Sequence, residues 1–413
     1  MKKVDFQAWR AKLMERYLIA KDSVLAGCLV TPEVYEGILE RFENFVAPFI
    51  EHLHKRVQRQ KAVDYMKGLM SDTERKNVES IAYYHSNDRQ PLQKFLGQVE
   101  WDDEIILDKL VKRVVREIGT KNGILVLDPT SFPKKGTQSV GVQRQWCGRL
   151  GKVENCQVAT FLAYVGAGEF ALVDRRLYLP KEWTDDPMRC RVAGVPEEHI
   201  IERTRHEQSV EMLKGRGKTL PHEWVAGDDE MGRIPWFRKA LREMNEPYVL
   251  AVPSNILIWD LEENVTTDAP VFISVQNWMK SVPAQRWKTI KVRLGHKGWL
   301  SVRLVTCRVR AMIEGEIGDE ETLIVSKWRD ETKKPRCDYY LSHNKERTDL
   351  DEYARVIKAA YRIEECFHRG KGECGLADYQ VRNWCGWHHH IALSMLSQWF
   401  LTEELLSQKK RFQ

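Results

Sequence analysis

The chain has 413 residues, of which 43% are hydrophobic and 30% are charged, and its net charge is +6. This length allows two or three domains with a substantial core, and the scattered cysteines, without a Cys-x-x-Cys pair, exclude a secreted disulfide framework. No signal peptide is apparent and no apolar stretch is long enough to span a bilayer, so we expect a cytoplasmic protein without a membrane partner.

The first part of the chain, residues 31 to about 115, is predicted to be helical. Thr31-Pro32-Glu33 combines a capping hydroxyl with a proline in the first turn. Ser71-Asp-Thr-Glu74 has the form of a capping box and should open another helix. Apolar residues at helical spacing predict a third helix from Asp103 to Ile118.

From Gly123 onward the apolar spacing becomes typical of strands. The continuous apolar run from Ile124 to Leu127 predicts a strand that is buried on both faces and ends at Asp128. Two β-rich runs around Gly166-Ala-Gly168 predict a hairpin. The next elements are predicted as helix over 202–218, strand over 224–227, helix over 234–245 and strand over 246–252.

Residues 254–345 interrupt this alternation with short β-like runs and without a long helix. We interpret them as a β-rich insertion, with runs over 288–294, 299–310 and 322–328. Helix returns near Leu350, and a last apolar helix is predicted over about 388–406.

Three carboxylates suggest a chemistry. Asp128 and Asp228 each follow an apolar strand-like run, and Glu364 lies on an amphipathic helical stretch. Phosphoryl transfer at a pair of Mg²⁺ ions, about 3.5–4 Å apart, requires oxygen ligands that converge on rigid elements. An Asp after a strand is also a common turn or cap residue, so the two Asp residues alone leave that alternative open.

The segments around these acids carry a family resemblance. The stretch Asp128-Pro-Thr-Ser-Phe-Pro-Lys-Lys-Gly136, with its continuation to Asn155-Cys-Gln157, resembles the first catalytic segment of IS701-type insertion-sequence transposases. These belong to the DDE superfamily, which has an RNase H-like catalytic core. Further similar segments are Tyr65-Met-Lys-Gly-Leu-Met, Glu74-Arg-Lys-Asn-Val-Glu, Leu177-Tyr-Leu-Pro-Lys-Glu-Trp183 and the stretch from Gly375 to His390.

The resemblance implies that Asp128, Asp228 and Glu364 are the catalytic acids and the metal ligands. Gly232 follows Asp228 at the family's spacing, and Phe367 and Lys371 follow Glu364 at theirs. The implied cofactor is two Mg²⁺ ions per active site, with Mn²⁺ as the alternative ion.

Rival ligands stand beside two of these acids, namely Asp229 and Glu230 in one loop and Glu365 on the helix. Many related enzymes have an Arg four residues before the catalytic Glu, where this chain has Ala360. Arg362 or Lys358 could replace that Arg.

The implied partner is double-stranded DNA, both the terminal inverted repeats of a transposon and the target, bound by a homodimer in the bacterial nucleoid. Basic residues supply backbone contacts without sequence information. The candidates are Lys134, Lys135, Arg144 and Lys371 near the acids, and Lys55, Arg56 and Arg59 in the helical part.

The implied fold is α/β, an RNase H-like mixed sheet with flanking helices. Residues 120–253 and 346–413 would form this core with the C-terminal helix, 254–345 the β-rich insertion, and 1–119 a helical DNA-binding region. The implied reaction is cleavage at transposon ends followed by joining of the 3′-hydroxyl to target DNA. The alternative is a DNA-binding protein derived from a transposase that targets or represses without catalysis.

Two further patterns remain ambiguous. In related hairpin-forming transposases an aromatic residue of the insertion holds a flipped base, and the candidates here are Trp278, Trp287, Trp299 and Trp328. His388-His-His390 with Cys366, Cys374 and Cys385 suggests zinc, but the spacings match no usual zinc motif, and we favour a structural role.

Overall fold

The computed structural model describes residues 36–85, 88–263, 270–295, 298–313, 315–328, 336–344 and 348–411. The helix start predicted at Thr31-Pro32-Glu33 lies outside these ranges. The chain divides into two compact units, residues 1–48 with 403–413, and residues 49–402. The smaller unit contains most of helix α2 (Ile38–Ile50) and the end of α15 (Trp384–Arg411), and Arg41 forms an ion pair with Glu404 at 2.6 Å there.

The larger unit begins with four helices, in the part of the chain that was predicted to be helical. In the third predicted helix, the Asp102 side chain caps the start by accepting from the Glu104 N–H, and one apolar face is buried. The four helices are α3 (Arg56–Leu69), α4 (Val78–Tyr84), α5 (Arg89–Gly97) and α6 (Asp103–Ile118).

The predicted capping box at Ser71 is wrong. The Ser71 hydroxyl donates to the Gly68 carbonyl at the end of α3 and lies 2.8 Å from the Thr73 hydroxyl, so it closes one helix instead of opening the next. Helix α4 starts later, at Val78, where the Asn77 side chain accepts from the Ser80 N–H.

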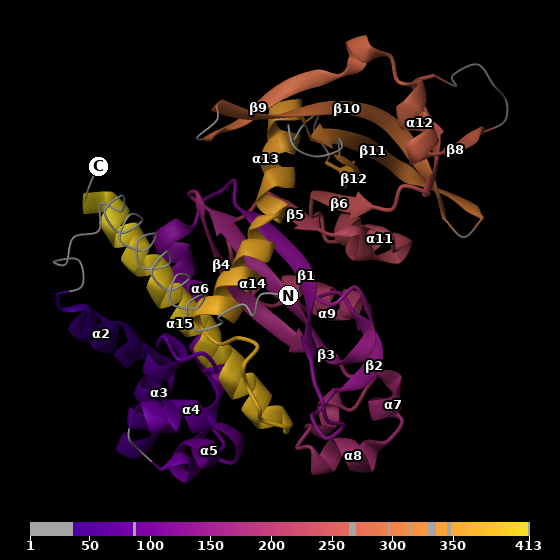
Figure 1. The fold of residues 1–413 in the computed structure, drawn as a ribbon. Coiled ribbons are helices and arrows are strands. Elements are labelled where there is room, and N and C mark those ends of the chain that lie inside the picture. Colours follow the sequence, from indigo (N-terminus) through magenta and orange to yellow (C-terminus); the bar gives the residue numbers. More distant parts are fainter. Residues whose placement is uncertain are drawn as a thin grey trace, which may run out of the picture. The chain divides into compact units, whose positions relative to one another are not determined.

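Within the described residues one twelve-stranded mixed sheet extends through the larger unit (Figure 1). Its strand order is β2-β3-β1-β5-β6-β12-β11-β10-β7-β8, with β4 on β3 and β9 on β10. The strands are β1 (Ile124–Pro133), β2 (Gln143–Cys147), β3 (Lys152–Gly166), β4 (Glu169–Leu177), β5 (Trp224–Gly227), β6 (Tyr248–Val252), β7 (Leu257–Asp260), β8 (Phe272–Ser274), β9 (Lys288–Gly295), β10 (Gly298–Ile313), β11 (Glu316–Trp328) and β12 (Arg336–His343).

The part of the sheet that carries the candidate acids has the order β4-β3-β1-β5-β6. Strands β4, β3 and β1 pair antiparallel, whereas β5 and β6 run parallel to β1. The predicted hairpin is confirmed as β3–β4, and its turn places Ala167 and Gly168 at positive φ, of 47° and 82°.

Strand β1 is longer than predicted, because Asp128 does not end it. Every residue of β1, from Ile124 to Pro133, is paired with the neighbouring strand β3, and Pro133 lies opposite Cys156. On the other side, pairing with β5 stops at Leu127. Beyond Asp128, β1 is therefore an edge on that side, where Pro129 is tolerated without a second ladder partner.

Helices cover both faces of this part of the sheet. Thr160 and Phe161 are consecutive on β3 and so point to opposite faces. Thr160 contacts Gln208 of α9 (Arg205–Lys214), and Phe161 contacts Phe367 of α14 (Arg362–Glu373) with ring centroids 5.3 Å apart. The prediction of a mixed α/β sheet with flanking helices is confirmed. The helices are α7 (Lys181–Thr184), α8 (Pro187–Val192), α9 (Arg205–Lys214), α10 (Asp229–Gly232), α11 (Pro235–Glu243), α12 (Val275–Ser281), α13 (Leu350–Ala360), α14 (Arg362–Glu373) and α15.

The three β-like runs predicted between residues 254 and 345 are strands β9, β10 and β11. These strands belong to the same sheet as β1, β5 and β6, because β12 pairs antiparallel with both β11 and β6. Strand β12 was not predicted, and it connects the β-rich segment to the strands that carry the candidate acids.

Candidate active site

The first two candidate acids lie side by side. Leu127 on β1 is in register with Gly227 on β5, and these are the last paired residues of the two parallel strands. Asp128 and Asp228 follow them directly, on strands that lie about 4.7–4.9 Å apart in a sheet. Neighbouring parallel strands thus deliver two carboxylates to the same place, as the sequence predicted.

The Asp228 side chain also caps a helix. Its Oδ1 atom accepts from the N–H groups of Glu230 and Met231, each at 3.1 Å, at the start of the short helix α10. Asp228 therefore does have the helix-capping role that is common for an Asp after a strand. This role occupies one carboxylate oxygen and fixes the orientation of the other.

The third acid lines the same cavity. Glu364 lies in the first turn of α14, is exposed, and borders a cavity of about 340 Å³ together with Asp128 and Asp228. No hydrogen-bonding partner of the Glu364 side chain is found among the described residues. Its carboxylate can therefore change rotamer without breaking an internal contact.

The electrostatics of the cavity reflect this crowding of acids. Burial, and then the charges of Asp228, Glu364 and Glu230, raise the pKa of Asp128 well above its ordinary value, while Lys371 opposes the shift. Burial raises the pKa of Asp228 to about 6, although the N–H of Met231 opposes it. Both carboxylates would be relieved by a bound cation.

The rival acids are engaged elsewhere. Asp229 forms an ion pair with Arg233, and Glu230 forms one with Arg205, both at 2.6 Å. Glu365 is held between Arg362 and Arg369, again at 2.6 Å. These contacts favour Asp228 and Glu364 as the acids that remain available for a ligand.

Lys371 points toward the first acid from the far end of α14. Its ammonium donates to the Thr130 hydroxyl at 2.7 Å, two residues after Asp128 on β1. Burial, and then the charge of Arg149, lower the pKa of Lys371 to about 8, and Asp128 opposes this shift. The lysine is thus part of the charge balance around Asp128.

The other basic candidates near the acids differ in environment. The Lys134 ammonium donates to the Tyr379 carbonyl at 3.1 Å and lies over the Tyr379 ring, and burial lowers its pKa to about 7. This internal contact removes Lys134 from the group of surface cations. Lys135 and Arg144 are exposed and remain candidates.

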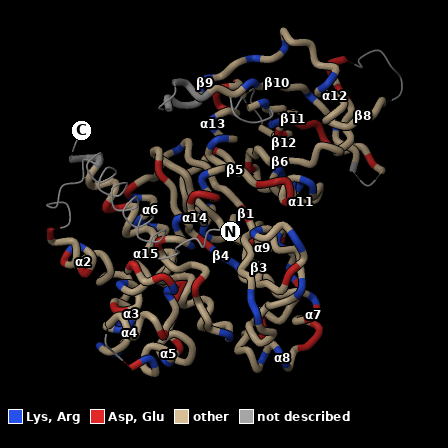
Figure 2. The backbone as a smooth tube through the Cα atoms, in the orientation of Figure 1, with Lys and Arg blue, Asp and Glu red and all other residues tan. Residues whose placement is uncertain are grey.

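The candidates in the helical part lie at the start of α3. Lys55 and Arg56 are exposed. Arg59 is also exposed, and its guanidinium donates to the carbonyls of Leu53 and Glu51. Basic and acidic residues are interspersed along the described backbone (Figure 2), so charge alone does not single out one DNA-binding face.

Two charged residues of the cavity were not predicted from the sequence. Arg336 and Asp338, both on β12, line the same cavity as Glu364 and form an ion pair at 2.8 Å. Ala360 lines it as well, so Arg336 is a cation that borders the same cavity as the position where related enzymes have an Arg. Arg362 and Lys358 line a different cavity. No local signal marked Arg336, because its position depends on the unpredicted pairing of β12 with β6.

The tryptophans considered for base holding are partly accounted for by packing. Trp278 and Trp287 are buried in a core cluster of the β-rich segment, at 2% and 8% exposure. Trp328 is partly buried, and its ring makes an edge contact with Tyr361. The side chain of Trp299 lies outside the described residues.

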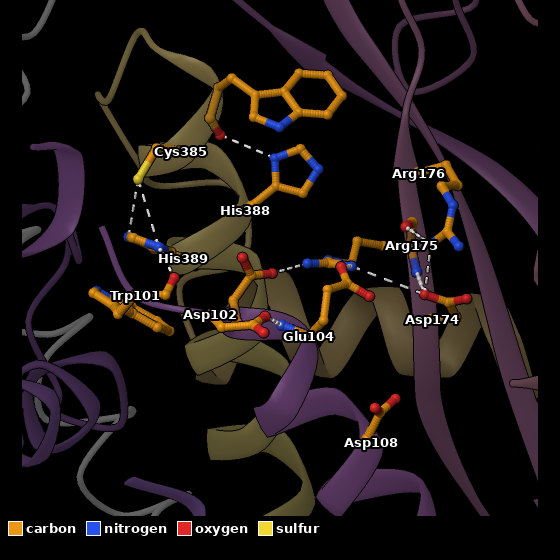
Figure 3. Close-up of polar contacts among 12 residues, drawn as sticks. Trp101, Asp102, Glu104, Asp108, Asp174, Arg175, Arg176, Cys385, His388 and His389 are labelled. Atoms are coloured by element: carbon orange, nitrogen blue, oxygen red, sulfur yellow. Dashed lines mark hydrogen bonds and ion pairs between the residues drawn. The ribbon is translucent and has the colours of Figure 1, made fainter. Parts of the chain in front are cut away.

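The histidine run has structural partners (Figure 3). His388 Nδ1 contacts the Trp384 carbonyl and His389 Nε2 contacts the Trp101 carbonyl, both at 2.9 Å. His389 Nδ1 contacts the Leu96 carbonyl, also at 2.9 Å. His390 Nδ1 lies 2.8 Å from the Tyr65 hydroxyl. These contacts support the structural role favoured from the sequence.

The three acids have the right chemistry to bind a metal ion, but their side chains are not yet arranged around one position. Carboxylate oxygens are the ligands that Mg²⁺ prefers, and three of them line one cavity. In the part of the chain that the structure describes, no three His, Cys, Asp or Glu side chains are already grouped closely enough to hold one ion.

Among the same residues, no helix is long and apolar enough to cross a membrane.

Fold and site together define a mixed α/β protein with an acidic cavity at the end of two parallel strands. The model of the DDE superfamily endonuclease family matches residues 48–299, more than half of the chain. The protein belongs to this family. The matched region includes Asp128 and Asp228, whereas Glu364 lies beyond it.

Two individual proteins are similar to this chain. A probable transposase for insertion sequence element IS701 from Microchaete diplosiphon is 29% identical over 190 residues, which are 46% of this chain and 47% of that protein. The resemblance to IS701-type transposases is confirmed as a distant one, and the chain matches about half the length of this relative. The cryo-EM structure of the piggyBac transposase synaptic complex with hairpin DNA aligns over 85% of this chain and 66% of that chain, at 12% identity and a TM-score of 0.40. A similarity of that size carries no conclusion about the fold.

Proposed function

We propose that this protein is a DNA transposase that cleaves transposon ends and joins the freed 3′-hydroxyl to target DNA. The observation that carries the proposal is the convergence of Asp128, Asp228 and Glu364 on one cavity, in a chain that belongs to the DDE superfamily endonuclease family. The strand order and directions of β4-β3-β1-β5-β6 support an RNase H-like core. The four-part division of the chain at residues 120, 254 and 346 remains part of the proposal.

Asp128, Asp228 and Glu364 would hold two Mg²⁺ ions, or Mn²⁺, which would activate the attacking oxygen and stabilise the leaving oxygen of the phosphodiester. The chain's own contribution is orientation. Backbone N–H groups fix one Asp228 oxygen and aim the other, and β1 holds Asp128 beside it. Glu364, which is exposed at the start of α14, would complete the set by a rotamer change.

Cations around the cavity would position the DNA backbone. The Lys371 ammonium donates to the hydroxyl of Thr130, two residues after Asp128, and Arg336 on β12 borders the cavity. An ammonium and a guanidinium at these places would contact phosphate oxygens on either side of the cleaved bond. Two transposon ends must be cut together, so we propose a homodimer on DNA.

The deciding experiment incubates the purified chain with Mg²⁺ and plasmids with and without the element's ends. The wild type should cut only the plasmid that carries the ends. Asp228→Asn keeps the capping oxygen and should abolish cutting, whereas the matched Asp229→Asn should retain it, since Asp229 is paired with Arg233. Glu364→Gln and Glu365→Gln form a second matched pair.

Three outcomes would oppose the proposal in different ways. Binding of the ends without any cutting would favour the non-catalytic DNA-binding protein. Cutting without preference for the ends would indicate a general nuclease of the RNase H type. Equal cutting by Asp228→Asn and the wild type would refute the site.

A further inference from the structure

The hairpin of β2 with the start of β3 has an apolar face that the described chain leaves uncovered. One of its faces is buried, where Cys147 and Cys156 pack with Val158. On the other face Trp146 and Val153 are cross-strand partners, exposed by 57% and 52%. Leu150, in the turn between the strands, is 46% exposed. Single exposed apolar residues are ordinary, but three on one hairpin indicate a contact surface.

The same hairpin carries several basic residues. Between Gln143 and Cys156 the basic residues are Arg144, Arg149 and Lys152, and the one acid, Glu154, is paired with Lys152 at 3.1 Å. Arg144 and Arg149 have no ion-pair partner among the described residues. An exposed indole on the same hairpin as two guanidinium groups without an ion-pair partner favours a polyanion with flat rings, which is nucleic acid, over a protein or a lipid surface.

The hairpin is fixed to the strand that carries the first acid. The Gly148 N–H in its turn donates to the Ser131 hydroxyl of β1 at 3.1 Å. The Asn155 side-chain amide donates to the carbonyls of Lys134 and Gly136, in the loop that follows β1. Ser131 is three residues beyond Asp128, or about 10 Å along a strand. A rigid support of this kind limits the entropy lost on binding.

We propose that the β2–β3 hairpin binds DNA beside the cleavage site, with Trp146 stacked on an unpaired base and Arg144 and Arg149 on the flanking phosphates. The proposal rests on the proposed function, because it places the bound DNA beside β1, the strand that carries Asp128. It assigns base holding to a tryptophan of β2, outside the β-rich segment.

The test measures affinity of the full chain for two labelled DNAs at one salt concentration, a blunt duplex and the same duplex with an unpaired thymine tail. The wild type should prefer the tailed duplex. Trp146→Ala should weaken binding of the tailed duplex by roughly 5- to 100-fold, the effect of losing one base–aromatic stack, and leave the blunt duplex unchanged. Trp146→Phe should retain most of the preference.

Trp236→Ala, which removes another exposed tryptophan, on α11, is the matched control and should bind both DNAs like the wild type. Thermal unfolding would verify that Trp146→Ala is folded. With 5-iodouracil in the tail, irradiation should crosslink the wild type at Trp146.

The failures can be told apart. If Trp146→Ala binds the tailed duplex as tightly as the wild type, the hairpin contact is overturned and the proposed function stands. An equal loss on both DNAs would overturn base stacking in favour of a contact with paired DNA. If the wild type binds neither DNA, the proposed function and the hairpin contact both fall.

Discussion

Protonation of His390 should make the protein sensitive to acid. The His390 ring is completely buried, and its Nδ1 lies 2.8 Å from the Tyr65 hydroxyl. Burial, and then the charge of Lys134, lower its pKa to about 3, against an ordinary value of 6.5. Below pH 6.5 the unfolded chain therefore binds a proton that the folded chain does not, and the free energy of unfolding falls as the pH decreases. The loss is about 1 kcal/mol at pH 6 and about 2 kcal/mol at pH 5.

His390→Gln removes the titrating group and keeps an acceptor for the Tyr65 hydroxyl. Urea unfolding at pH 7.5 and pH 5 gives the loss of stability for each variant, and any constant effect of the substitution cancels. The wild type should lose about 2 kcal/mol more than His390→Gln over this interval. His368→Gln, which removes an exposed histidine on α14, should behave like the wild type. Equal losses in the wild type and His390→Gln would refute the reasoning.

Three other predictions concern the cavity. Mg²⁺ at saturating concentration should raise the unfolding temperature of the wild type but not of Asp128→Asn, because only the acidic cavity gains from a bound cation; an equal rise in both, by differential scanning calorimetry, would place the ion elsewhere. Arg336→Ala should slow cleavage of end-containing DNA by roughly 10- to 100-fold, because a charged hydrogen bond is lost. Arg308 is an exposed arginine of β10 that is paired with Glu320, and Arg308→Ala is the control that should cleave like the wild type. Lys371→Met should weaken cleavage more than Lys371→Arg, which keeps the charge beside Thr130, and identical single-turnover rates would contradict this.

Elements specified by local signals were predictable from the sequence. Helix α6 begins at its capping Asp102 and ends at Ile118, because both the cap and the apolar stripe lie within the helix itself. The β3–β4 hairpin followed from two apolar runs around a glycine-containing turn. The position of Asp228 after β5 followed in the same way.

Features set by distant pairing were not predictable. β1 continues past Asp128 only because β3 is long enough to pair with it, and β12 is a strand between β11 and β6. Arg336 and Asp338 reach the cavity only through that pairing. The capping box predicted at Ser71 was wrong for a related reason, because the Ser71 hydroxyl donates to a carbonyl at the end of α3. The exposure of Trp146 likewise depends on which face of the β2–β3 hairpin packs inward.

The two interpretations of Asp228, as a helix cap or as a metal ligand, turn out not to compete. The cap uses Oδ1, which accepts from two backbone N–H groups, and leaves Oδ2 for another partner. Without the cap, the carboxylate could rotate away from Asp128 to relieve their repulsion. With it, the side chain is held beside Asp128 in a buried place, and burial is the largest cause of the raised pKa of each carboxylate. A local capping signal thus supplies the rigidity that a ligand at this cavity would require.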